Sequence, residues 1–438
     1  MSKEVVILGA GESGIGAAIL AQQKGFEVFV SDRGTIQEKY KEELTTYGIP
    51  NEEGQHDENR ILAAAMIVKS PGIPDTVPLI KAAVEKGIPV ISEIEFAYRY
   101  TDAKLIAITG TNGKTTTTLL LYHVLKTAGF RVELAGNVGF SFARKVAQAE
   151  QPDYYVLELS SFQLDGIRQF RPNIALLLNI TPDHLDRYDY QMAYYIRSKF
   201  RIAMNQTEED SFFYNGEDAN ITAAPHWDAL KAKRLPIRYS TIEKEGLLHE
   251  QGQFEIKMLG QHNAINTAFA VQVALHLGAS PRLVQQGIDT FVGAPHRLEV
   301  VATIDEVLYI NDSKGTNVDA TFYALDAMTG PTVWIAGGQD KGNDYTSLLP
   351  LVKKYVKALV CLGADNTKLI ATFGPLVATV VETKTAAAAA EAAQHLAKAG
   401  DTVLLSPACA SFDLFDNFAQ RGDLFRAAVL TLKENKKR

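Results

Sequence analysis

One loop constrains this chain more than any other part of its sequence: Gly110-Thr111-Asn112-Gly113-Lys114-Thr115. It follows an apolar, β-branched run over residues 105–108 and precedes a segment over 116–125 that is typical of a helix. A strand, a glycine-turned loop and a helix start bring backbone N–H groups and one ammonium around a phosphate. The pattern therefore predicts a P-loop in which Lys114 reaches the β- and γ-phosphates of a nucleotide and the Thr115 hydroxyl binds Mg²⁺.

The loop departs from the usual P-loop at one position. A standard P-loop has its first glycine five residues before the glycine of Gly-Lys-Thr, and that position is Ile108 here. The alternative is a turn that contains Gly-Lys-Thr by chance, which the strand before it and the helix after it disfavour. We therefore expect a tighter variant of the P-loop, outside its ordinary subfamilies.

Length and composition bound the class of protein. A chain of 438 residues is too long for one core and predicts two or three domains. The hydrophobic share of 46% and the charged share of 22% are typical of a globular protein. The net charge is −7 and no basic stripe is visible, so we expect no nucleic-acid partner.

The sequence also predicts a cytoplasmic location without a membrane partner. Its two cysteines, Cys361 and Cys409, lack metal-ligand spacing, as is common in a reducing compartment. Residues 1–4 run directly into a predicted strand, which leaves no room for a signal peptide. No apolar run approaches the length of a membrane span.

The first segment has a second glycine-rich loop. A predicted strand over 5–8 leads into Gly9-Ala10-Gly11-Glu12-Ser13-Gly14, followed by a helix to about Lys24 and a strand over 27–30 that ends near Asp32. Taken alone, this fingerprint predicts a dinucleotide-binding βαβ unit. Such a loop accepts any nucleotide diphosphate on the helix N-terminus, so the ligand stays open, and the carboxylate of Glu12 has to point away from it.

The remaining pattern predicts three α/β units in series, over 1–92, 93–294 and 295–438. The first is expected to be Rossmann-like, the second a P-loop domain with a parallel sheet, and the third Rossmann-like again. Further strands are predicted over 63–68, 90–92, 131–135, 154–159, 174–179, 307–311, 332–336, 358–362 and 402–405, and helices over 191–205, 263–277 and 386–393.

Polar residues at two predicted strand ends suggest a metal site. Glu158 ends one strand and His184 follows another, and ligands of open parallel sheets bind at such ends. A carboxylate and an imidazole there could complete the Mg²⁺ shell begun by Thr115. The alternatives are a salt bridge for Glu158, an ordinary loop residue at His184 and helix caps at Asp183 and Asp186. From position alone, Lys199 is an exposed lysine, and Cys409 is a packed residue rather than a nucleophile.

Together the motifs resemble one family over essentially the whole chain, the Mur ligases, which are ATP-dependent amide-forming enzymes of peptidoglycan synthesis. The resemblance lies in the P-loop, Glu158-Leu159-Ser160-Ser161-Phe162-Gln163, His184-Leu185-Asp186, Gly260-Gln261-His262-Asn263-Ala264-Ile265-Asn266, Pro295-His296-Arg297 and Asn311-Asp312-Ser313-Lys314-Gly315-Thr316-Asn317. Residues 158–164, 184–188 and 406–413 resemble the branch that adds D-glutamate, and the Asp-Asn-Pro-Arg signature of the diamino-acid-adding relatives is absent.

The resemblance implies a set of site residues. ATP would contact Gly110, Thr111, Asn112, Gly113, Lys114, Thr115, Thr116, Asn263, Asn266, Arg297, Asp312 and Lys314. The UDP-sugar substrate would contact Gly11, Glu12, Ser13, Gly14, Asp32, Arg33, Ser70 and Asn137. D-Glutamate would contact Thr316, Lys341, Ser411, Phe412 and Phe418. Metal would be held by Thr115, Glu158, His184 and Lys199, the last as a carbamate, and the catalytic set would be Lys114, His184 and Lys199.

The activity so implied is ATP-dependent ligation of D-glutamate to UDP-N-acetylmuramoyl-L-alanine through an acyl phosphate. Mg²⁺ would be the metal, with a second Mg²⁺ on the carbamylated lysine, in a monomer whose third segment moves about Pro295. Four alternatives are weighed: a Mur-type ligase for another amino acid, a folate polyglutamate synthetase, an NAD-dependent oxidoreductase and a P-loop ATPase coupled to motion. The last two each explain only one segment.

Overall fold

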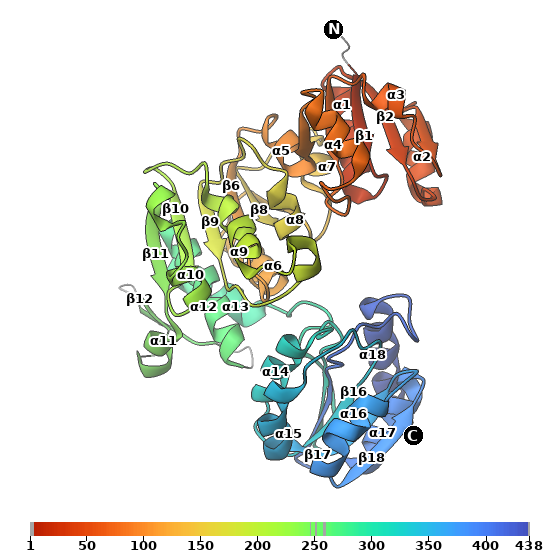
Figure 1. Ribbon diagram of the computed structural model, residues 1–438. Helices are drawn as coiled ribbons and strands as arrows, with labels where there is room; N and C mark the ends of the chain where they lie inside the picture. Colours follow the sequence, from red (N-terminus) through yellow and green to blue (C-terminus); the bar gives the residue numbers. More distant parts are fainter. Residues whose placement is uncertain (1–3, 246, 250–251, 257–259, 437–438) are drawn as a thin grey trace. The chain divides into compact units, whose positions relative to one another are not determined.

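The computed structural model describes residues 4–245, 247–249, 252–256 and 260–436 (Figure 1). They form α/β units with mostly parallel sheets, which confirms the predicted fold class. The chain divides into two compact units: residues 1–255 with 265–291, and residues 256–264 with 292–438. Among the described residues, no helix is both long and apolar enough to cross a membrane.

The N-terminal sheet is entirely parallel, with the order β3-β2-β1-β4-β5. Its order reverses at β1, so the loops after β1 and β4 open at neighbouring strand ends, where nucleotides bind in such sheets. The strands are β1 (Glu4–Leu8), β2 (Glu27–Asp32), β3 (Asn51–Glu53), β4 (Met66–Lys69) and β5 (Val90–Ser92), and the helices are α1 (Glu12–Gln23), α2 (Glu38–Thr46), α3 (Glu58–Ile61), α4 (Pro78–Glu85) and α5 (Glu93–Tyr98).

The central sheet has the order β11-β10-β9-β6-β8-β7, and all of its strands are parallel. The P-loop follows β6, between the strands that end near Glu158 and Asn179. The strands are β6 (Lys104–Thr109), β7 (Val132–Gly136), β8 (Tyr154–Glu158), β9 (Ile174–Leu177), β10 (Ser211–Asn215) and β11 (Lys233–Ile237). The helices are α6 (Lys114–Thr127), α7 (Phe142–Val146), α8 (Ser161–Asp165), α9 (Met192–Phe200), α10 (Ala219–Thr222), α11 (Tyr239–Glu245), α12 (Gln261–His276) and α13 (Pro281–Thr290), and a hairpin joins β12 (Leu247–His249) to β13 (Gly252–Phe254).

The C-terminal sheet has the order β14-β15-β19-β16-β17-β18, and only β14 is antiparallel to its neighbour. Its three central strands end in the loops that carry the C-terminal motifs. The strands are β14 (Glu299–Ile304), β15 (Val307–Asn311), β16 (Thr332–Ala336), β17 (Val356–Leu362), β18 (Thr379–Thr383) and β19 (Thr402–Leu405), and the helices are α14 (Val318–Asp326), α15 (Leu349–Tyr355), α16 (Thr367–Phe373), α17 (Ala386–Leu396) and α18 (Phe418–Asn435).

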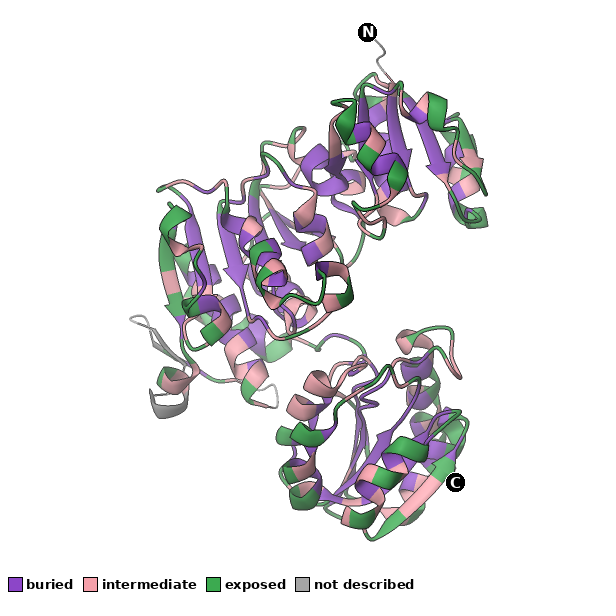
Figure 2. Ribbon diagram, viewed as in Figure 1, coloured by how far each residue is buried: buried purple, intermediate pink, exposed green. Residues whose placement is uncertain are grey.

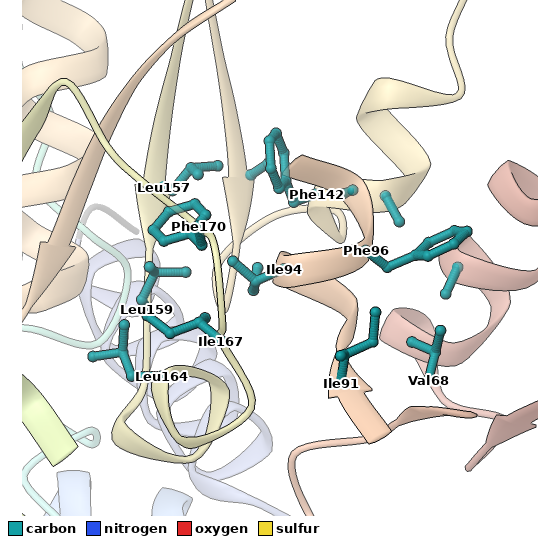
Figure 3. Close-up of a cluster of buried hydrophobic side chains, with 14 of the residues drawn as sticks. Val68, Ile91, Ile94, Phe96, Phe142, Leu157, Leu159, Leu164, Ile167 and Phe170 are labelled. Atoms are coloured by element: carbon teal, nitrogen blue, oxygen red, sulfur yellow. The ribbon is translucent and has the colours of Figure 1, made fainter. Parts of the chain in front are cut away.

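The inner parallel strands are buried on both faces, as Figure 2 shows, which explains why they read as continuous apolar runs. In the first unit one hydrophobic core runs from the N-terminal sheet to the central sheet through α5. Figure 3 shows Ile94 of α5 beside Leu159 and Ile167, while Ile91 and Phe96 lie toward Val68. The loops of both sheets in this unit therefore share one packed support.

The structure corrects several predicted elements. The helix expected over 191–205 ends at Phe200, and a 3₁₀ turn over Arg201–Ala203 follows it. The strand expected over 63–68 begins at Met66, and the one expected over 174–179 ends at Leu177. Strands β3, β10, β11, β12, β13, β14 and β18 were not expected. Several of them lie at sheet edges, where exposed polar residues interrupt the apolar run.

Candidate active site

The P-loop turns at a position that only glycine fits. Gly113 has φ of +80°, and a Cβ there would stand 2.5 Å from the amide oxygen of Asn266. Helix α6 then starts at Lys114, so its first N–H groups face the loop. Asn263 and Asn266 lie in the first turns of α12, and Asn266 is buried beside the loop.

A residue that the sequence analysis missed holds this loop in place. Asn179 accepts a hydrogen bond from the Asn112 N–H at 2.8 Å and donates one to the Asn112 carbonyl at 3.0 Å. The hydroxyl of Thr111 is turned inward, donating to the Thr181 carbonyl at 3.0 Å and accepting from the Thr181 N–H at 3.0 Å. Thr111 therefore has only its backbone to offer a nucleotide. Asn179 falls inside the run predicted as strand, which hid its role.

Two lysines meet at the same carbonyl. Lys114 Nζ donates to the Gly110 carbonyl at 2.9 Å and to the Thr111 carbonyl at 2.7 Å. Lys199 Nζ donates to the Gly110 carbonyl at 2.8 Å. The Gly110 carbonyl, directly after β6, therefore accepts hydrogen bonds from two amines.

Lys199 is buried, with 1% of its surface exposed, so the exposed lysine expected from position alone is wrong. The face of α9 that carries Tyr195, Ser198 and Lys199 packs inward, and the Tyr195 ring lies 4.6 Å from the lysine Nζ. Burial lowers the pKa of Lys199 well below its usual range, and the charge of Lys114 lowers it further. The lowered pKa favours the neutral form of this amine.

Glu158 ends β8 with 2% of its surface exposed. One carboxylate oxygen accepts a hydrogen bond from the Asn137 side chain at 2.8 Å. The other is buried and has no hydrogen-bond partner among the described residues. A buried, unpartnered carboxylate oxygen at a strand end fits a divalent cation and disfavours the salt-bridge alternative.

His184 is placed differently. Its side chain is 55% exposed, its φ is +51°, and its ring lies edge-on to Phe162 at 5.2 Å. Asp183 is 3.6 Å from its Nε2. Among the described residues, no group of three His, Cys, Asp or Glu side chains is arranged to hold a metal. Metal binding here would thus depend on oxygens of the nucleotide and of water.

The N-terminal glycine loop packs against the loop that follows β4. A Cβ on Gly9 would stand 2.4 Å from the hydroxyl oxygen of Ser70, so these two loops touch. Asp32 accepts hydrogen bonds from the Ala10 N–H at 2.6 Å and the Gly34 N–H at 2.7 Å. Its carboxylate shapes the loop, while Arg33 and Gly11 remain exposed.

Glu12 points away from the loop toward the central sheet. Its carboxylate accepts from the Ser141 N–H at 3.1 Å and forms an ion pair with Arg144 at 2.7 Å. Arg144 also pairs with Glu43 of α2 at 2.6 Å. Arg144 therefore neutralises the negative charge within the glycine loop, and the Glu12 carboxylate points away from the loop, as the sequence analysis expected.

In the second unit, Asp312 follows β15 and is buried. Its carboxylate accepts from the Ser406 hydroxyl at 2.8 Å and from the Leu298 N–H at 3.2 Å. Burial raises its pKa to about 7, against the opposing effects of these hydrogen bonds and of Arg297. This carboxyl thus holds the Arg297 turn and the ends of β15 and β19 together.

The five residues expected to bind D-glutamate lie on three loops and one helix start of this same unit. Lys314 Nζ lies 3.9 Å from the ring centre of Phe418, and Lys341 Nζ lies 5.9 Å from that of Phe412. Phe412 is 65% exposed, whereas Ser411 is buried and Thr316 is half-buried. Residues Gln339 and Ala410 pair as an isolated bridge, which brings the Lys341 loop beside the Ser411 loop.

Cys409 and Tyr345 lie in contact beside the Ser411 loop. The thiol is buried, lies 3.2 Å from the Tyr345 hydroxyl, and has a pKa raised by burial. Cys361 is buried as well, and both cysteines are free. This confirms Cys409 as a packed residue, and its raised pKa disfavours the thiolate that a nucleophile needs.

Comparison with known proteins identifies the protein family. Three family models match in order: the MurD-like N-terminal domain of Mur ligases over residues 3–92, the Mur ligase middle domain over 108–274 and the Mur ligase glutamate ligase domain over 296–409. The chain belongs to the Mur ligase family, and it is an ATP-dependent ligase that forms amide bonds. This confirms the resemblance seen in the motifs.

Its relatives indicate a branch within the family. The UDP-N-acetylmuramoylalanine–D-glutamate ligases of Christiangramia forsetii and Bacteroides fragilis are each 50% identical to it. These alignments cover 99% and 98% of this chain and 100% of both relatives. The crystal structure of the UDP-N-acetylmuramate-alanine ligase from Thermotoga maritima has a TM-score of 0.61 at 18% identity, covering 98% of this chain and 100% of that one, and supports the fold.

Proposed function

We propose that this protein joins D-glutamate to UDP-N-acetylmuramoyl-L-alanine with ATP, releasing ADP and phosphate. The observation that carries the proposal is the 50% identity, over the full length of both chains, to relatives that bear that name. The pair formed by Lys114 and the buried Lys199 at the P-loop supports it, because a dehydrogenase has no use for that pair. ATP and a UDP-sugar are cytoplasmic metabolites, so we place the enzyme in the cytoplasm.

We assign the binding of the three substrates to the expected domains, 1–92, 93–294 and 295–438. The glycine loop with Arg33 and Ser70 would bind the UDP group, the P-loop with Asn263 and Asn266 would bind ATP, and the C-terminal unit would bind D-glutamate. Every candidate group comes from one chain, so a monomer is the functional unit that we propose.

The chemistry follows from charge. The substrate carboxylate attacks the γ-phosphorus, and an acyl phosphate forms as ADP leaves. Lys114 offsets charge that spreads over the transferring phosphoryl oxygens. The neutral amine of D-glutamate then attacks the acyl carbon, a proton is lost from nitrogen and phosphate leaves. His184, exposed at the strand ends, is the candidate acceptor of that proton.

Mg²⁺ fits the residues present. The unpartnered oxygen of Glu158 and the hydroxyl of Thr115 are hard oxygen donors, and Mg²⁺ accepts one or two protein oxygens beside phosphates and waters. When bound, the ion would neutralise phosphate charge. His184 is the less suited ligand, since it is exposed and lies next to Asp183. A carbamate on Lys199 would supply further oxygens, and the lowered pKa of that amine favours its reaction with CO₂.

One assay tests the function. Purified protein is incubated with ATP, Mg²⁺ and UDP-N-acetylmuramoyl-L-alanine, and each candidate amino acid is offered in turn. We expect incorporation and phosphate release with D-glutamate only. L-Glutamate and D-aspartate are the matched controls. Phosphate release without an amino acid would favour a motor-type ATPase, and equal use of another amino acid would overturn the assignment to this branch.

A further inference from the structure

Arg421 is a buried cation with an unusual set of partners. It lies in the second turn of α18 with none of its surface exposed, and no carboxylate of the described residues is within ion-pair distance of it. Burial lowers its pKa to about 10. Its contacts are to neutral oxygens of the chain. A guanidinium is rarely buried in this manner unless its donors are all needed.

Those oxygens belong to the ends of three neighbouring strands. Arg421 Nε donates to the Ser313 hydroxyl at 3.0 Å, and one terminal nitrogen donates to the Ser313 carbonyl at 2.9 Å. Longer bonds of 3.3 and 3.4 Å reach the Gly337 and Cys409 carbonyls. Ser313 follows β15, Gly337 follows β16 and Cys409 follows β19. One planar side chain therefore fixes the spacing of three loops.

Contacts at the start of α18 place the Arg421 side chain against the three strand ends. Asn417 caps the helix, and the Ser313 hydroxyl donates to the Phe418 carbonyl at 2.8 Å. A Cβ on Gly422 would stand 2.2 Å from a ring nitrogen of His296, so glycine lets the helix approach that buried histidine. The Asn311 side chain donates to the Gly422 carbonyl at 3.1 Å.

We propose that Arg421 is the positioning residue of the amino-acid pocket: by binding the backbone of the β15, β16 and β19 loops it sets the spacing of Thr316, Lys341 and Ser411. The inference rests on the proposed function, since it takes that pocket to receive D-glutamate. Lysine cannot replace arginine there, because an ammonium has no planar fork and would leave at least one buried carbonyl without a donor.

The test compares Arg421→Lys with Arg426→Lys. Arg426 lies on the same helix and pairs with Glu299 at 2.7 Å, away from the three loops. Initial rates are measured with D-glutamate and with the UDP-sugar varied separately. We expect Arg421→Lys to raise the KM for D-glutamate about tenfold or more, with the KM for the UDP-sugar within about twofold of wild type. The control variant should match wild type in both.

Folding of the C-terminal unit is followed separately. The chain has two tryptophans, Trp227 and Trp334, and Trp334 is buried and donates to the Ser406 carbonyl at 2.8 Å. In a Trp227→Phe background, an unchanged Trp334 emission shows that Arg421→Lys is folded. The proposal is overturned if the KM for D-glutamate is unchanged. It is also overturned if the variant loses both all of its activity and the native Trp334 emission. A wild-type enzyme that ignores D-glutamate would overturn the proposed function instead.

Discussion

At the scale of single residues, the site depends on two lysines that share one carbonyl. Lys114 begins the helix that follows the glycine loop, and that position was predictable from the motif alone. Lys199 was not, because a lysine in mid-helix is normally exposed. The burial of Lys199 follows from the packing of α9 against the P-loop, which no local pattern encodes. The same limit hid Asn179 and Arg421, whose partners are distant in sequence.

Replacing Lys114 with alanine should lower kcat by about 10²–10³, as expected when one charge-stabilising donor is removed from a transition state. Phosphate release at saturating substrate measures this. Lys126→Ala is the matched control, since Lys126 lies on the same helix α6 but is bound to Tyr122 at the surface. Turnover at the wild-type rate in the Lys114 variant would refute the P-loop role.

Lys199 should carry a carbamate. Burial lowers the pKa of this amine and so favours the neutral form, which is the form that adds CO₂. Protein equilibrated with ¹³C-bicarbonate should therefore give one carbamate resonance in the ¹³C spectrum, and Lys199→Arg should abolish it. Acidification should remove the signal, because the amine is then protonated. A spectrum without that resonance at pH 8 would contradict the prediction.

At the scale of elements, parallel strands with continuous apolar runs were predictable, and edge strands were not. Strands β15, β16 and β19 begin and end where the sequence predicts, because each lies in the centre of a sheet with both faces buried. β11 and β18 are edge strands with exposed polar residues, and they leave no such pattern. Where a helix packs is also set by distant partners. Helix α7, held at its N-terminus by Glu12 and Glu93, shows this.

The contact between α5 and α7 predicts a pH dependence of stability. Glu93 is buried, accepts from the Ala143 N–H, and its other oxygen has no hydrogen-bond partner among the described residues. Burial raises its pKa from 4.5 to about 8. Between these values the folded chain holds a proton that the unfolded chain has lost, so the free energy of unfolding falls as pH rises through this window and levels off above it.

Glu93→Gln keeps the acceptor oxygen and removes the titration. We compare the melting temperature of the variant with that of wild type at each pH. We expect this difference, variant minus wild type, to be a few degrees larger at pH 8.5 than at pH 5. Thermal unfolding at several pH values measures the difference, with the exposed Glu85→Gln as control. A difference that does not vary with pH would show that Glu93 is already ionised, or equally protonated, in both states.

At the scale of the whole molecule, the candidate groups are distributed over two compact units. The nucleotide loop and the lysine pair belong to the first unit, and Asp312, Lys341 and Ser411 belong to the second. The proposed reaction would need both sets to act on the same phosphate and amine. An acyl phosphate also has to be kept from water, because it hydrolyses readily. From both requirements we predict that the second unit moves about the region of Pro295 when ligands bind.

Small-angle scattering tests that closure. The radius of gyration should fall when a non-hydrolysable ATP analogue and the UDP-sugar are both present. Each ligand alone separates the contributions, and the UDP-sugar alone should cause the smaller change because it contacts the first unit. If compactness is the same with and without both ligands, the units are already held together or never meet, and protection of the acyl phosphate has to come from within the first unit.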